Sequence, residues 1–172
     1  MFMMRFANDC INDRRYQEAN SIYEWLWEME VGTDYEDGEF ADLDTLAENG
    51  IIVTDIKQLA LQTLYANYQV LKKEKRAEML YLYFNHSAFK NLHMEEIFHV
   101  GREALKDQKQ FWEDWIVLLK NKQGDIAGRL LKDAVLYSQG IDGLVHIADE
   151  SGSSTPFALS CCYGCVWQST GL

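Results

Sequence analysis

Apolar residues recur with a helical period along most of the chain, and this feature constrains the fold more than any other. Between residues 16 and 30 they return every three or four positions, which places them along one stripe of an α-helix. Comparable stripes cover residues 3–13, 56–71, 77–89, 93–106, 108–123 and 125–139. The chain has a single proline, Pro156, and one short β-branched run. The sequence therefore predicts an all-α fold.

Turn and capping residues divide these stripes into about eight helices joined by short links. The expected signals are Gly32 as a stop, Asp44 or Thr45 as one cap, and Thr54 or Asp55 as the next. Consecutive helices on short links pack as antiparallel hairpins. We therefore expect a single domain over residues 1–172, built as a short α-solenoid or as a compact helical domain.

Three segments fall outside this regular pattern. Residues 32–44 are acidic and are expected to form a loop, and the run KKEKR at 72–76 is expected to be a charged connection. Residues 151–172 begin with a Ser/Thr-rich stretch. For this last segment the sequence allows three alternatives: a helix, a docked coil or a frayed tail.

The negative charge of the chain is concentrated near its beginning. The formal net charge is −11, and residues 1–50 contribute −10 of it, from thirteen acidic residues and three arginines. Such a chain repels phosphate, which argues against general binding to nucleic acid or to anionic membranes. The acidic region is interpreted as a solvated surface, as a docking surface for a basic partner, or as a mimic of DNA phosphates.

Within residues 3–31, one predicted helix has a large and a small residue side by side, Phe6 and Ala7, and the next has a small, an aromatic and an apolar residue, Ala19, Tyr23 and Leu26. With these residues at the matching positions, the segment resembles a tetratricopeptide-like helix hairpin. The resemblance implies a helical repeat that acts as a scaffold and carries no chemistry of its own. No clear repeat period is present in the rest of the sequence.

Two motifs carry residue types that bind metals. Cys162 and Cys165 form a CxxC pair, and Glu96 and His99 share one helical face as an ExxH pair. Neither motif supplies the four ligands of a structural zinc site, so we expect no cofactor. A metal-binding helical-bundle enzyme is kept as an alternative, in which Glu96 and His99 would point inward.

The function that best fits these features is a non-enzymatic scaffold or adaptor for a protein or peptide. Its binding groove is expected to consist of aromatic and acidic residues: Tyr16, Tyr23, Glu24, Trp27, Glu28, Tyr65 and Tyr68. The partner is expected to be basic, and a homodimer is reasonable. An acidic inhibitor or DNA mimic of a mobile element is the alternative. Without a signal peptide or a long apolar run, a cytoplasmic location is expected.

Overall fold

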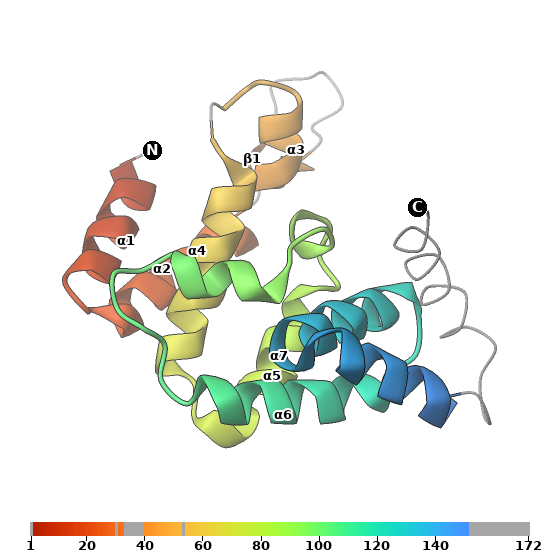
Figure 1. The fold of residues 1–172 in the computed structure, drawn as a ribbon. Helices are drawn as coiled ribbons and strands as arrows, with labels where there is room; N and C mark the ends of the chain where they lie inside the picture. Colours follow the sequence, from red (N-terminus) through yellow and green to blue (C-terminus); the bar gives the residue numbers. More distant parts are fainter. Residues whose placement is uncertain (1, 30, 33–39, 53, 152–172) are drawn as a thin grey trace, which may run out of the picture. The chain divides into compact units, whose positions relative to one another are not determined.

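The computed structural model describes residues 2–29, 31–32, 40–52 and 54–151, and the prediction of an all-α fold is confirmed for this part of the chain (Figure 1). The chain consists of two compact units, Met1–Gln108 and Lys109–Leu172. None of the described helices combines the length and apolar character needed to cross a bilayer. The expectation of one domain over residues 1–172 stays a prediction.

The elements of the first unit are, in chain order, α1 (Phe2–Asn12), α2 (Tyr16–Glu28), β1 (Val31–Gly32), β2 (Phe40–Ala41), α3 (Leu43–Glu48), α4 (Ile56–Val70), α5 (Lys73–Tyr83) and the 3₁₀-helices η1 (Ser87–Phe89) and η2 (Met94–His99).

The first two helices of this unit form a hairpin. Helices α1 and α2 pack together through small buried residues, Ala7 on α1 and Ala19 on α2. Small side chains let two helix backbones approach, and Tyr23 of α2 is fully buried as well.

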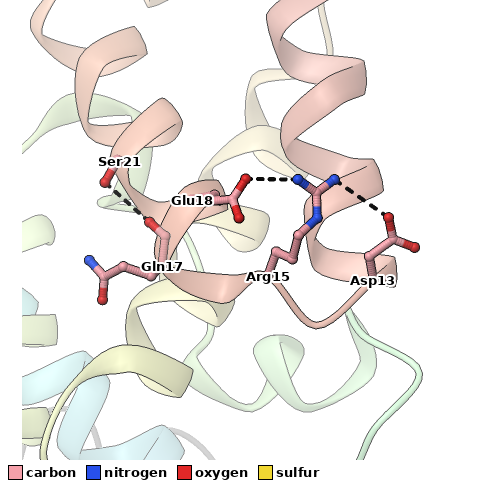
Figure 2. Close-up of polar contacts among 5 residues, drawn as sticks. All are labelled: Asp13, Arg15, Gln17, Glu18 and Ser21. Carbon is pink, nitrogen blue, oxygen red and sulfur yellow. Dashed lines mark hydrogen bonds and ion pairs between the residues drawn. The ribbon is translucent and has the colours of Figure 1, made fainter.

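The turn between α1 and α2 is linked by polar contacts near the surface (Figure 2). The guanidinium of Arg15 donates to Glu18 at 2.7 Å and to Asp13 at 3.5 Å. One turn further on, the hydroxyl of Ser21 donates to the backbone carbonyl of Gln17 at 3.1 Å. Because these ion pairs are exposed, they contribute little to stability. The hairpin is held mainly by its apolar core.

Helix α4 forms the centre of the first unit. It contacts α2, α5, η1 and η2, and nine of its residues are buried. Its N-cap is Asp55, whose carboxylate accepts from the backbone N–H of Gln58 at 2.9 Å, so one of the two predicted caps is confirmed. Gly101 lies against the ring of Tyr65, where a Cβ atom would collide with the phenol. Glycine at this position therefore allows the chain after η2 to approach α4.

Two predicted helix starts in the first unit are wrong. Helix α3 is capped by Asp42, which accepts from the N–H of Thr45 at 3.1 Å, and not by Asp44 or Thr45. Asp44 lies one residue inside the helix and is buried. The KKEKR run is mostly the first turn of α5, because it contains good helix formers and no glycine or proline. Within it, the guanidinium of Arg76 is buried over the ring of Tyr68, 4.0 Å from its centroid.

The segment 93–106 is also less helical than predicted. It contains the six-residue 3₁₀-helix η2 and then bends and turns. The acidic segment is described only at its ends, where Val31 pairs with Ala41 and Gly32 with Phe40 in a short antiparallel ladder. Residues 33–39 and 152–172, which include most of the predicted acidic loop and the C-terminal segment, lie outside the described residues.

The second unit contains α6 (Gln108–Lys120) and α7 (Asp125–Ser151). Helix α6 buries Trp112, Trp115 and Leu119 along one stripe, as its sequence predicts. The ring of Trp112 packs on Tyr137 of α7, with 5.0 Å between centroids. Helix α7 is interrupted at Gly140, which has φ 71° and ψ −162°, so the predicted helix end at this residue corresponds to a kink between two helical segments.

Candidate functional site

Three of the predicted groove residues belong to the core of the first unit. Tyr23, Tyr65 and Tyr68 are at most 1% exposed. The hydroxyl of Tyr68 donates to the backbone carbonyl of Lys106 at 2.8 Å, which fixes the ring between α4 and the chain that follows η2. Buried side chains offer no surface to a partner, so the prediction that these tyrosines line an open groove needs correction. The helical periodicity places these tyrosines on apolar stripes, and in the structure all three are packed in the interior.

Tyr16 occupies a different position from the other predicted residues. Its ring meets Tyr65 edge-on at 6.0 Å, and its hydroxyl donates to the carboxylate of Glu103 at 3.1 Å. Burial raises the pKa of the Tyr16 phenol, and the hydrogen bonds with Tyr65 and Glu103 raise it further. Tyr16 therefore joins α2 to the chain after η2 and does not line the cavity described next.

An open cavity of about 310 Å³ lies between α2, α5 and η1. We call it the aromatic groove, and its lining residues are Trp27, Met79, Leu82, Tyr83, His86 and Phe89. Met79, Leu82 and Tyr83 come from α5, where spacings of three and four residues place them on one face. Leu82 is 53% exposed and Met79 41% exposed. The groove thus leaves large apolar side chains in contact with solvent.

Trp27 forms the α2 wall of this groove and is held in place on two sides. Its indole N–H donates to the hydroxyl of Thr63 on α4 at 2.8 Å. Its ring packs against Phe89 at 4.9 Å and against His86 at 5.4 Å between centroids. A tryptophan fixed by both a hydrogen bond and ring contacts offers a rigid apolar surface.

Two carboxylates lie near Tyr83, a residue that lines the groove; we call them the acidic rim. Burial raises the pKa of the Tyr83 phenol, and the negative charges of Glu24 and Glu28 raise it further. Both glutamates are exposed on α2, and Glu24 accepts from the side-chain amide of Asn20 at 2.9 Å. The Tyr83 hydroxyl itself accepts from Asn67 at 2.8 Å. The groove therefore combines an apolar floor with carboxylates that favour a positively charged ligand.

A second cluster lies next to the groove and shares His86 with it. Asp42, Asp44 and His86 each place one potential metal-ligating atom within 4.8 Å of the others; we call this group the Asp–His cluster. Hydrogen bonds from Thr45 hold the pKa of Asp42 below its ordinary value against the opposing effect of burial, and the interaction with His86 lowers it further. The sequence places both aspartates at the end of the expected acidic loop, with Asp44 as a candidate cap of the next helix. The packing of η1 against α3, more than forty residues apart, has no local signal.

The predicted metal-binding residues are used differently or lie outside the described chain. Glu96 accepts from the ammonium of Lys57 at 2.6 Å and from the backbone N–H of His93 at 3.2 Å, which forms the capping box of η2. His99 is the exposed last residue of η2. Within the described residues, the Asp–His cluster is the one group with the spacing of a metal site. Cys162 and Cys165 lie outside the described residues.

Comparison with protein-family models, curated proteins and solved structures gives no match for this chain. The tetratricopeptide-like resemblance, the DNA-mimic alternative and the metal-enzyme alternative accordingly stay predictions.

Proposed function

We propose that the first unit is a non-enzymatic helical scaffold that binds an amphipathic helix of a partner protein in the aromatic groove. The observation that carries this proposal is the exposure of Leu82 and Met79 beside the fixed ring of Trp27. A helix presenting apolar residues at intervals of three and four would cover these side chains and remove them from water.

The composition of the groove supports a protein partner over a small metabolite. Trp27, Tyr83 and Phe89 supply rigid rings, and Met79 supplies a flexible side chain that adapts to different shapes. Aromatic residues and methionine are enriched at the centres of protein interfaces. The cavity volume, about 310 Å³, is at the lower end of the range for small-molecule pockets, about 300–1,000 Å³.

The charge around the groove supports a basic partner. Glu24 and Glu28 lie near Tyr83, and residues 1–50 carry a formal charge of −10. A partner helix with lysine or arginine beside its apolar stripe would be attracted to this rim, and an acidic helix would be repelled. The occupant proposed here is therefore a basic amphipathic helix of another protein.

The proposal is tested by selecting displayed helical peptides against the purified full-length chain and measuring affinities of the enriched peptides by calorimetry. We expect enrichment of peptides with an apolar i, i+3, i+4 stripe and basic flanks. Leu82→Asp should weaken their binding at least tenfold, since it places a carboxylate in the apolar floor. Ile51→Asp is the matched control, because Ile51 is a 55% exposed aliphatic residue of the same unit and does not line the groove.

Three results would contradict the proposal. Equal binding to the wild type and Leu82→Asp would place the interaction elsewhere. A wild-type dimer that Leu82→Asp dissociates in sedimentation experiments would make a second copy of the chain the occupant. Tight, saturable binding of a synthetic 152–172 peptide to the groove would make the chain's own C-terminal segment the occupant.

A further inference from the structure

The Asp–His cluster brings together three potential ligands from two elements that are distant in sequence. Asp42 caps α3 and Asp44 lies in its first turn, while His86 caps η1. One oxygen of each carboxylate and one imidazole nitrogen all lie within 4.8 Å of one another. Two carboxylates and one imidazole form a donor set that suits Zn²⁺ and related divalent transition metals.

Asp44 gives independent support for a cation at this position. It is 7% exposed, and its Oδ1 atom is buried without a hydrogen-bond partner among the described residues. Its other oxygen, Oδ2, accepts a short hydrogen bond from the hydroxyl of Ser87. A buried carboxylate oxygen without a partner is costly, and a bound cation would remove that cost.

We propose that Asp42, Asp44 and His86 bind a zinc ion that ties the start of α3 to the start of η1. Two carboxylates would balance the charge of the ion, and neutral His86 would add a third ligand. Water would fill the remaining position, since three protein ligands leave a zinc site open. The proposal concerns the Asp–His cluster alone and does not depend on a partner in the aromatic groove.

The three side chains already take part in hydrogen bonds that a metal would have to share or replace. Asp42 caps α3 through Oδ1, which accepts from the backbone N–H of Thr45, and a carboxylate has a second oxygen that can ligate a metal. His86 accepts from the backbone N–H of Ala88 through Nδ1 at 3.3 Å. Ligation through Nε2 would move the ring proton to Nδ1 and give up this hydrogen bond. Bonds to zinc of about 2.0–2.2 Å require the three donors to move closer together than 4.8 Å, so binding should tighten the contact between α3 and η1.

Zinc content after equilibrium dialysis tests this site in the full-length, reduced protein. Wild type should bind one more zinc ion per chain than Asp44→Asn or His86→Ala. The matched control is His93→Ala, because His93 caps η2 as His86 caps η1 but lies outside the cluster. His93→Ala should bind as much zinc as the wild type. Zinc held by cysteines would be equal in all four proteins and would cancel in the comparison.

Thermal unfolding with and without zinc supplies a second readout. Zinc should raise the unfolding midpoint of wild type and His93→Ala, and it should leave Asp44→Asn and His86→Ala unchanged. In chelator, Asp44→Asn should unfold at or above the wild-type temperature, since it removes a buried charge while keeping the side-chain shape. Equal zinc content in all four proteins, or an equal midpoint shift in all four, would overturn the proposal.

Discussion

Trp25 and Trp27 lie two positions apart on α2 and have different environments. Trp25 is 50% exposed, whereas Trp27 packs on Phe89 and donates to Thr63. Residues two apart on a helix point about 200° away from each other. The sequence therefore predicts that only one of the two tryptophans faces a given neighbouring helix. The helical period alone does not decide which of the two faces inward.

The indole hydrogen bond of Trp27 should contribute measurably to stability. Trp27→Phe keeps an aromatic ring but removes the donor to Thr63, and it should lower the free energy of unfolding by about 1–2 kcal/mol. Trp25→Phe should change it by less than about 0.5 kcal/mol. Urea unfolding followed by circular dichroism measures both values. Equal effects of the two substitutions would show that the bond to Thr63 does not hold α2 against α4.

The ion pair of Glu96 predicts a pH-dependent contribution. Partial burial opposes ionisation of Glu96, but the hydrogen bonds from Lys57 and His93 outweigh it and lower its pKa. A lowered carboxyl pKa stabilises the folded protein at pH values above the ordinary pKa of glutamate, about 4.3. This stability is lost as the pH falls through the lowered pKa. Because the pair is near the surface, the contribution should stay below about 1 kcal/mol.

Glu96→Gln isolates this charge, because glutamine can keep the capping contact to His93. The variant should be less stable than wild type at pH 7, and the difference should shrink toward pH 3. Urea unfolding at both pH values measures it. A difference that is constant with pH would mean that the ion pair with Lys57 contributes nothing.

At the scale of elements, helix α7 contains a matched pair of glycines. Gly128 has helical backbone angles with open space where a Cβ would lie, whereas Gly140 adopts a conformation almost restricted to glycine. Gly128→Ala should therefore stabilise the protein by about 0.5–1 kcal/mol, and Gly140→Ala should destabilise it by about 1–3 kcal/mol. Thermal unfolding of the two variants checks the signs. Stabilisation by Gly140→Ala would mean that α7 is straight.

The elements themselves were predictable where a stripe of apolar residues is long and uninterrupted. Helices α2, α4 and α6 begin at or within two residues of the predicted positions. Prediction was wrong for residues 93–106, which form a 3₁₀-helix followed by bends, with Gly101 packed against Tyr65. It was also wrong at Asp42 and Asp44, because several neighbouring acids can each serve as a cap and tertiary burial decides among them.

Less of the candidate site could be predicted. Three residues of α2 were expected at a binding surface. Trp27 lines the aromatic groove, and Glu24 and Glu28 lie near its lining residue Tyr83. Met79 and Leu82 gave no such signal, because an exposed apolar residue and a core residue have the same spacing on a helix. The meeting of His86 with Asp44 depends on a tertiary contact between distant segments.

At the scale of the whole molecule, the uneven charge should control the rate of association. Raising the salt concentration from about 0.05 M to 0.5 M shortens the screening length from more than 10 Å to a few Å. The association rate of a basic peptide selected for the groove should then fall at least tenfold, with a smaller change in dissociation. Glu24→Gln combined with Glu28→Gln should reduce this salt dependence. Stopped-flow tryptophan fluorescence measures the rates, and an association rate independent of salt would contradict electrostatic selection.

Methyl NMR spectroscopy of methionine-labelled protein tests the central claim, that the aromatic groove binds the partner helix. Met79 lines the groove and is 41% exposed, whereas Met3 is 37% exposed on α1 and serves as an internal control in the same spectrum. On titration with a selected basic helical peptide, the Met79 methyl signal should shift in proportion to the bound fraction while the Met3 signal stays in place. Saturable binding that shifts Met3 and leaves Met79 unchanged would contradict the account.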